Sequence, residues 1–330
     1  MPCAQLSELP PPPKGRSGWP WTEGSNTLPA KTSGGCEWPR VTVVTPSYNQ
    51  ADFVEETLRS VLLQGYPNLE YLVLDGGSTD GSVAILEKYA PWIDYWVSEP
   101  DGGQSAAINH GLGMGAGAFA CWINSDDLLH QNALFEHATR VGFASGVVYV
   151  GLCAHIAVDS SKLSMRESGI HSLEDLLRVR EVWRRGRHIT QAEVLFPRQL
   201  FLDVGALDVS NHYSMDYDLW GRFFLAGAEF RNTGIPFGMF RLQPDQKTGN
   251  RIETTYSLVD AALKLLDQSH GIPAKTREIL REDLLAYREE YPELLRRNRG
   301  LLDRMGVPPP LAMPIRRMKA RLAGLFQGKT

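Results

Sequence analysis

Short apolar runs alternate with predicted helices from residue 41 to about residue 130. The apolar runs are typical of buried strands and cover 41–45, 67–75, 94–99 and 118–123. The predicted helices between them cover 51–64, 78–90 and 103–117, and the first has apolar residues at helical spacing. Strands that alternate with helices in this way predict an α/β fold, a mostly parallel sheet with helices on both faces.

The second half of the chain has a less regular pattern. An apolar stretch over 147–158 predicts a hairpin or a meander. Further helices are predicted over 172–185, 197–208, 214–230 and 252–304, followed by a short basic amphipathic segment at 315–326. The sequence therefore predicts that a helical C-terminal extension follows the α/β fold.

Local composition divides the chain into three parts. Residues 1–39 are rich in Pro, Gly and Ser and predict an extended segment whose Trp19 and Trp21 pack on the folded body. Residues 40–245 are the predicted α/β domain, with halves at 40–130 and 131–245. Residues 246–330 are the helical C-terminal region with its basic amphipathic tail.

Composition narrows the class of protein. The chain has 330 residues, of which 43% are apolar, and its net charge of −4 argues against nucleic acid as a partner. Its four cysteines include no CxxC pair, which argues against a zinc site and fits a reducing cytoplasm. The start lacks the apolar core of a secretion signal, and no apolar run is long enough to span a bilayer. We therefore expect a cytoplasmic globular protein.

Polar turns follow all four predicted strands. Their sequences are "TPSYN", "DGGSTDG", "EPDGGQ" and "NSDD". The carboxyl ends of parallel strands meet at one edge of the sheet, where open α/β folds bind their ligands. Crowded carboxylates repel one another unless a cation or a ligand's donors satisfy them. This edge is therefore the predicted binding site.

Asp75 stands where an acid binds a ribose hydroxyl in dinucleotide folds, which raises an NAD-dependent dehydrogenase as an alternative. That alternative needs Gly-x-Gly-x-x-Gly after the first strand, and this chain has Thr-Pro-Ser-Tyr-Asn there. Without those glycines the phosphates need another partner. A divalent cation, Mg²⁺ or Mn²⁺, held by the acids of "SDD" is the natural candidate.

Several motifs occur in the order and at the spacing of a known family. They are "VTVVTPSYNQ", "LVLDGGSTDGS", "EPDGGQSAAINHG" and "CWINSDD". Together they resemble the nucleotide-sugar domain of family 2 glycosyltransferases, and the resemblance covers about residues 40–245. It implies a GT-A-like (Rossmann-like) fold and an inverting, usually metal-dependent sugar transfer. It also makes 40–130 the nucleotide-sugar-binding half and 131–245 the acceptor and catalytic half.

The resemblance implies roles for individual residues. The turn after the first strand lines the nucleotide pocket with Thr45, Pro46, Ser47, Tyr48 and Asn49. Asp75 accepts a hydrogen bond from the base, and further candidate donor contacts are Ser78, Asp80, Gln104 and Asn109. From the residues alone, these last four can equally start a helix or satisfy polar groups inside one.

The acid pair Asp126 and Asp127 matches the family's DXD motif, which holds the metal and the ribose or diphosphate. Asn124 stands where many members have another Asp, so the resemblance leaves open which carboxylate contacts the metal. The segment "SMDYDLWGRF" resembles the one that carries the catalytic base, and Asp216 takes that position. Gln243 stands where a His often lies near the diphosphate, and no metal ligand is predicted there.

The resemblance also implies the partners. The donor is a nucleoside-diphosphate sugar, with a UDP-sugar favoured, and the acceptor is a glycan or a lipid-linked saccharide of cell-envelope polysaccharide, lipopolysaccharide or other glycan synthesis. The basic tail predicts peripheral contact with an anionic membrane at its inner face. Two other functions stay open: a nucleotidyltransferase acting on sugar phosphates, and a non-catalytic nucleotide-sugar-binding module.

Overall fold

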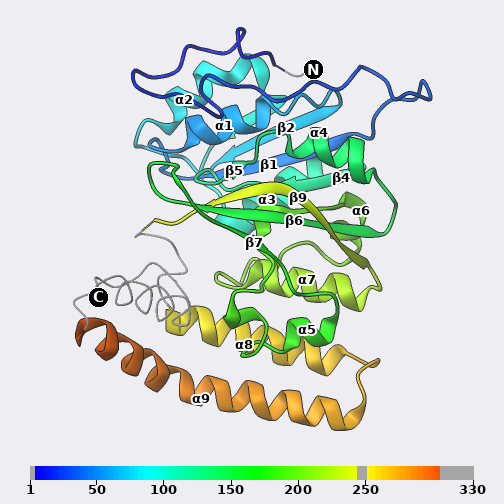
Figure 1. Cartoon of the computed structure of the whole chain (residues 1–330), viewed down its shortest axis with the longest axis vertical. Helices are drawn as coiled ribbons and strands as arrows, with labels where there is room; N and C mark the ends of the chain where they lie inside the picture. Colours follow the sequence, from blue (N-terminus) through cyan, green and yellow to red (C-terminus); the bar gives the residue numbers. More distant parts are fainter. Residues whose placement is uncertain (1–3, 244–250, 305–330) are drawn as a thin grey trace, which may run out of the picture.

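The computed structural model describes residues 4–243 and 251–304, with side chains as far as residue 296. Its centre is a nine-stranded sheet with the order β3-β2-β1-β4-β8-β6-β9-β5, in which β7 pairs with β6 (Figure 1). The predicted α/β architecture is confirmed, and the sheet is mixed because its second half adds antiparallel pairs.

The first half of the sheet is parallel, as the alternating pattern predicts. β1 (Val41–Ser47) lies between β2 (Leu69–Asp75) and β4 (Phe119–Trp122), and β3 (Tyr95–Ser98) pairs with β2. The crossover helices are α1 (Val54–Leu62), α2 (Ser82–Tyr89) and α3 (Gln104–Met114). All four strands therefore end at the same edge of the sheet, where the polar turns begin.

The second half of the sheet differs from the prediction in several elements. The apolar stretch forms one long strand, β6 (Val147–Ile156), with β7 (Lys162–Glu167) as its hairpin partner. β5 (Leu128–Leu129), β8 (Val194–Pro197) and β9 (Glu229–Arg241) were not predicted. β9 runs parallel to β6 and antiparallel to β5, so it brings the chain back beside the acidic turn after β4.

Helices complete the two layers around the sheet. The short ones are α4 (Ala133–Glu136), α5 (Leu173–Leu177) and α6 (Arg198–Asp203), and the long ones are α7 (Met215–Leu225), α8 (Arg251–Gln268) and α9 (Ala274–Arg304). The helix predicted over 172–185 is much shorter than expected, because α5 ends at Leu177 and only a 3₁₀ turn at Trp183–Arg185 follows. In Figure 1, α7, α8 and α9 lie successively farther from the sheet.

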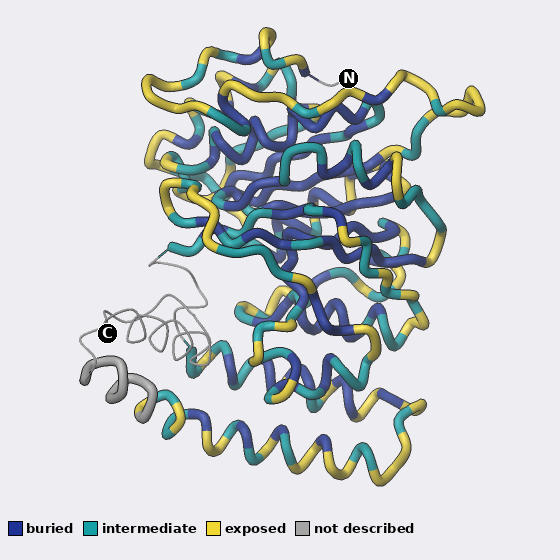
Figure 2. The backbone as a smooth tube through the Cα atoms, viewed as in Figure 1, coloured by how far each residue is buried: buried dark blue, intermediate teal, exposed yellow. Residues whose placement is uncertain are grey.

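Two hydrophobic cores lie on opposite faces of the sheet, and β1 shows how they arise. Val44 faces a core with α3, α7, α8 and α9, whereas Val41 and Val43 face a core with α1 and the N-terminal segment. Alternate residues of a strand point to opposite faces, so a continuous apolar run buries both. Figure 2 shows this buried interior as a dark band through the sheet.

The N-terminal segment packs on the folded body through Arg59 of α1. The Arg59 side chain is fully buried and donates to the carbonyl oxygens of Pro10, Pro20 and Trp21 at 2.8–3.0 Å. Trp21 is buried against this guanidinium, and the Trp19 indole donates to the Leu129 carbonyl oxygen at 3.0 Å. The predicted packing of both tryptophans is confirmed.

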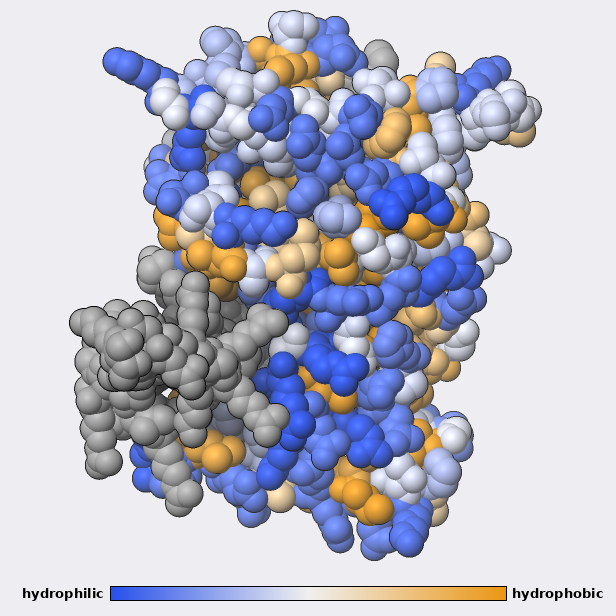
Figure 3. Space-filling model, in the orientation of Figure 1, coloured by the Kyte–Doolittle hydropathy of each residue, from blue (hydrophilic) through white to orange (hydrophobic). Residues whose placement is uncertain are grey.

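The surface shown in Figure 3 is mainly hydrophilic, with hydrophobic side chains in small groups between polar ones. In the described ranges, none of the helices combines the length and the apolarity that a bilayer crossing needs. The predicted amphipathic segment at 315–326 lies outside the described residues.

Candidate active site

Hydrogen bonds join the turn after β1 to the turn after β2. Asn49 adopts a left-handed backbone conformation with φ of 50°. Its N–H donates to Ser78 Oγ at 2.7 Å, and its Oδ1 accepts from the Thr79 N–H at 2.9 Å. Asp80 accepts from the Ala51 N–H at 2.9 Å. In this structure Asn49, Ser78 and Asp80 brace the two turns against each other.

Within the β1 turn, only some side chains are accessible. Thr45 and Pro46 are buried, and Thr45 Oγ1 lies 2.9 Å from the Tyr71 hydroxyl. Ser47 is 5% exposed, and its hydroxyl has no hydrogen-bond partner among the described residues. The Tyr48 ring is 62% exposed. The turn therefore exposes an aromatic ring, while the neighbouring Ser47 hydroxyl is buried and has no hydrogen-bond partner among the described residues.

Asp75 is at the end of β2, beside Ser47 in the register of the sheet. It is 1% exposed and accepts hydrogen bonds from the Ser78 N–H, the Ser78 hydroxyl and the Ser98 hydroxyl at 2.6–2.8 Å. A carboxylate has about four acceptor positions. Three are used, so one acceptor position remains.

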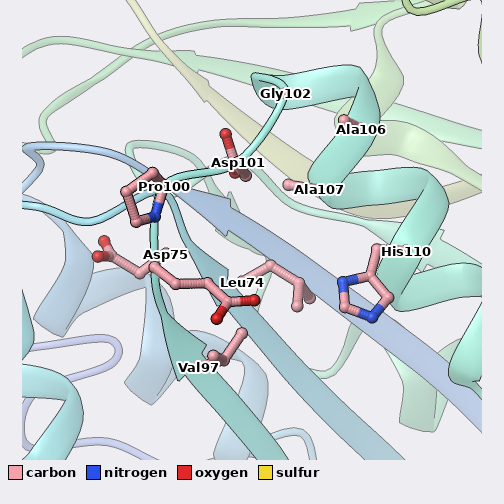
Figure 4. A pocket seen from close by; sticks show the side chains of 10 residues that line it. Leu74, Asp75, Val97, Pro100, Asp101, Gly102, Ala106, Ala107 and His110 are labelled. Carbon is pink, nitrogen blue, oxygen red and sulfur yellow. The ribbon is translucent and has the colours of Figure 1, made fainter.

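A cavity of about 250 Å³ opens beside Asp75, between the end of β3 and the first turns of α3. Leu74, Val97 and Ala107 form its apolar part, while Asp101 and His110 enter from the rim (Figure 4). Its position at the carboxyl ends of β2 and β3 is where open α/β sheets bind ligands.

The two acids after β4 have different surroundings. Asp127 is 1% exposed, and its carboxylate accepts from the Arg241 N–H at 2.9 Å, Gln191 Nε2 at 2.8 Å and Asn124 Nδ2 at 3.3 Å. Asp126 is half-buried and accepts from Gln243 Nε2 at 2.5 Å through Oδ2. No side chain in the described part of the chain donates to Asp126 Oδ1, so the Asp126 carboxylate has fewer side-chain partners than that of Asp127.

Burial raises the pKa of both acids. For Asp126 desolvation is the main cause, and hydrogen bonding to Gln243 opposes it. For Asp127 desolvation and then the neighbouring Asp126 charge raise the pKa well above its usual range. Two desolvated carboxylates side by side repel each other, and this repulsion favours the binding of a proton or a cation.

Two polar residues of α3 differ in what they contact. Gln104 Nε2 donates to Asn124 Oδ1 at 2.7 Å, so the start of α3 is tied to the acidic turn. Asn109 donates to the Leu207 carbonyl oxygen at 2.8 Å and accepts from the Leu207 N–H at 2.9 Å. Both ends of the Asn109 amide are used by backbone, an arrangement that favours a structural role.

Asp216, the candidate base, lies in the first turn of α7. Desolvation raises its pKa to about 6, although the Tyr217 N–H donates to it at 2.8 Å and opposes the shift. The neighbouring Met215 sulfur lies 2.8 Å from the Ser105 hydroxyl, next to Gln104. Asp218, by contrast, is 2% exposed and paired with Arg222 at 2.8 Å. Of the two acids, Asp216 is therefore the one without an ion pair among the described residues.

Residues 42–202 match the family described as Glycosyl transferase family 2. These residues form a family 2 glycosyltransferase domain. An uncharacterized glycosyltransferase of Rickettsia typhi is 29% identical to it over 250 residues, which span 72% of this chain and 76% of the relative. The predicted enzyme class, a glycosyltransferase, is thereby confirmed. The family match ends before Asp216, so the role of Asp216 depends on its geometry.

Solved structures share the fold of this glycosyltransferase. The fragment 1–349 of S. aureus TarS in complex with UDP-GlcNAc is 15% identical with a TM-score of 0.58, over 76% of this chain and 73% of that fragment. Mannosyltransferase PcManGT from Pyrobaculum calidifontis, in complex with GDP-Man and Mn²⁺, is 21% identical with a TM-score of 0.56, over 93% of this chain and 85% of PcManGT. At these identities the comparison confirms the predicted GT-A fold.

The residues of this glycosyltransferase fit a divalent cation at Asp126. Mg²⁺ binds through one or two carboxylates together with substrate phosphates, and Asp126 offers one unused oxygen in a desolvated setting. Within the described ranges, no group of three His, Cys, Asp or Glu residues could hold a metal by itself. The donor set therefore suits a cation that is completed by diphosphate oxygens.

The sequence did not reveal two residues that hold the acidic turn in place. Gln191, in a 3₁₀ turn before β8, and Arg241, at the end of β9, both donate to Asp127. Each comes from a strand or turn that the apolar pattern did not reveal. Gln191 Oε1 is buried and unpartnered among the described residues.

Proposed function

We propose that this glycosyltransferase moves a sugar, with inversion, from a nucleoside-diphosphate sugar to an acceptor hydroxyl, and that it requires Mg²⁺ or Mn²⁺. The observation that carries the proposal is the contrast between the two acids after β4. Asp127 is saturated by donors of the protein, whereas Asp126 keeps an unused oxygen beside it. One anchored and one available acid is what a cation bound together with a diphosphate needs.

A series of side-chain contacts connects this acid pair to the candidate base. Asn124 of the acidic turn binds Gln104, whose neighbour Ser105 contacts Met215, next to Asp216. In addition, Trp122 at the end of β4 stacks on Trp220 of α7 with ring centroids 5.6 Å apart. The start of α3 and the stacked indoles therefore fix α7, and with it Asp216, relative to the end of β4.

The residues divide the chemistry. Asp216, with a pKa of about 6, is ionised at neutral pH and accepts the proton of the attacking hydroxyl. Asp126 would hold the cation, whose positive charge would stabilise the departing diphosphate. Asp75 and the Ser47 hydroxyl orient the base and ribose, and the exposed Tyr48 ring covers the nucleotide.

The proposed donor is a UDP-sugar, and the proposed acceptor is a glycan or lipid-linked saccharide of envelope polysaccharide synthesis. The TarS structure was solved with UDP-GlcNAc, which supports a UDP-sugar, whereas PcManGT was solved with GDP-Man. We further propose that the enzyme works in the cytoplasm, at the inner face of the membrane, through its basic tail.

The test is a panel of UDP-, GDP- and TDP-sugars, each measured for thermal stabilisation with and without Mn²⁺. We expect a shift in Tm for one donor that disappears with a chelator, because a ligand that binds only the folded state stabilises it. Hydrolysis or transfer of that donor then separates an enzyme from a binding module. Pyrophosphate release from a nucleoside triphosphate and a sugar phosphate would instead show a nucleotidyltransferase.

A further inference from the structure

A buried arginine lies behind the acid pair. Arg241, at the end of β9, is fully buried together with Glu56 of α1, and the two form an ion pair at 3.1 Å. The free-energy cost of removing two charges from water is large unless further hydrogen bonds satisfy both groups. The surroundings of Arg241 provide these bonds.

Both the backbone and the side chain of Arg241 hold the acidic turn. Its N–H donates to the Asp127 carboxylate at 2.9 Å, and its Nε donates to the Asp126 carbonyl oxygen at 2.7 Å. One residue thus fixes the carboxylate of one acid and the main chain of the other.

The rest of the guanidinium binds two other elements. Nη1 donates to the carbonyl oxygens of Ala157 and Val158 and to Ser160 Oγ, all in the turn between β6 and β7, at 2.9–3.2 Å. Ser160 in turn donates to Glu56 at 2.7 Å. The guanidinium also lies 5.0 Å from the ring centroid of Phe53, just after the nucleotide-binding turn.

We infer that Arg241 is a positioning residue, which holds Asp126 where a cation and a diphosphate can bind. This inference rests on the proposed metal-dependent function. The network joins the acidic turn to α1, which follows the donor turn, and to the β6–β7 turn. Two residues after Arg241, Gln243 binds the Asp126 carboxylate itself. Asp126 is therefore held from its main chain and from its side chain by the same segment.

A lysine cannot take over these contacts. The guanidinium is planar and has five N–H donors in a fixed arrangement, whereas an ammonium is a point charge with three. In Arg241→Lys the charge can still meet Glu56, but the bonds to the Asp126 carbonyl and to the β6–β7 turn are lost together. Loss of such outer contacts typically lowers metal affinity on the order of 10- to 100-fold.

Arg59 offers a matched control. It is also a fully buried arginine that donates to several backbone carbonyl oxygens and stacks on an aromatic ring, but it holds the N-terminal segment and not the acids. Arg59→Lys therefore removes a comparable set of contacts. A general loss of stability is expected in both variants, and a loss of metal affinity only in Arg241→Lys.

The experiment measures free Mn²⁺ by electron paramagnetic resonance while the full chain is titrated in saturating UDP. We expect Arg241→Lys to weaken Mn²⁺ binding at least about tenfold, and Arg59→Lys to bind as the native protein does. Equal Mn²⁺ affinity in all three proteins, or an equal loss in both variants, would overturn the inference.

Two further outcomes are informative. If the native protein binds no Mn²⁺ with UDP or GDP, the proposed metal-dependent function fails and this inference fails with it. If Arg241→Lys does not fold, Glu56→Gln carries the same test, because Glu56 holds Arg241 directly and through Ser160 and, within the described ranges, has no hydrogen bond to either acid. A several-fold weaker Mn²⁺ affinity in Glu56→Gln supports the inference, and unchanged affinity overturns it.

Discussion

A carboxyl group can remove a proton only after it has lost its own, and Asp216 loses its proton at about pH 6 because it is desolvated. Because the pKa of Asp216 is raised to about 6, the fraction of ionised carboxylate, the form that can act as the proposed base, decreases as the pH falls through 6. We expect kcat/KM to be constant above about pH 7 and to fall roughly tenfold per pH unit well below 6. A pH–rate profile at saturating Mn²⁺ measures this.

Substitutions at Asp216 and Asp218 separate the base from its neighbour. Asp216→Asn should lose on the order of 10²–10⁴ in kcat and keep its affinity for the donor. Asp218→Asn weakens the pair with Arg222 and so lowers stability, but it should keep the midpoint near pH 6. A profile that is flat from pH 5 to 8, or a midpoint that moves in Asp218→Asn, would contradict the assignment.

The sequence predicted which residues gather at the site better than what each one does there. Asp75, Asp80 and Asn109 follow strands or lie on a helix whose place the apolar pattern gives. Whether their side-chain oxygens are already used, however, depends on partners elsewhere in the chain, such as Ser98 for Asp75 and Leu207 for Asn109. A linear pattern contains no information about such pairings, so only the structure distinguishes a bracing carboxylate from an available one.

The turn between β4 and β5 combines a stability role and a binding role in adjacent residues. Asp127→Asn places an amide where one carboxylate oxygen meets Gln191 and Asn124, and we expect a loss of about 1–3 kcal/mol of unfolding free energy. Asp126→Asn disturbs only the contact with Gln243 and should cost less than about 1 kcal/mol. Urea denaturation of both variants measures the difference.

The same two variants should differ in the opposite sense in ligand binding. Asp126→Asn loses the oxygen that is available to a cation, so calorimetry should show no increase in nucleoside-diphosphate affinity when Mn²⁺ is added. A folded Asp127→Asn should keep part of that increase, because it keeps Asp126. If the two variants bind Mn²⁺ and nucleotide alike, the division of roles within the turn is wrong.

At the level of elements, the longest strand that the pattern missed, β9, contains strand breakers. β9 includes Gly234, Pro236 and Gly238, which normally lower the propensity for a strand. The structure needs Gly238 because a Cβ there would lie 2.2 Å from the Ala192 carbonyl oxygen. The missing side chain permits the close approach of β9 to the turn that carries Gln191. The glycine that lowers the strand propensity of β9 is therefore required by the packing around the acidic turn.

In the whole molecule, tertiary contacts explain part of the basic run at 178–188, whose sequence alone fits either a solvated face or a loop over an anionic ligand. Arg180 pairs with Asp283 and Glu290, and its guanidinium lies 5.2 Å from the ring centroid of Tyr287. Arg184 lies 4.9 Å from the ring centroid of Tyr291. These charges bind α9 to the body, which leaves the tail after residue 304 as the stronger candidate for an anionic partner.

The last prediction concerns that tail, which lies outside the described residues. The sequence places Ile315, Met318, Leu322 and Leu325 at helical spacing, with Arg316, Arg317, Lys319 and Arg321 between them. Each basic residue contributes about 1 kcal/mol near an anionic surface, which gives reversible attachment. We therefore expect the full chain to float with anionic vesicles at low salt and to be released at high salt.

A variant truncated after Pro310 provides the control, because it keeps α8 and α9 and lacks the basic stripe. It should remain at the bottom of the gradient with the same vesicles, and the full chain should remain there with neutral ones. Electrostatic attraction to a surface requires both the basic residues and the lipid charge, so both controls remove it. Flotation of the truncated variant, or of the full chain with neutral vesicles, would show that the attachment has another cause.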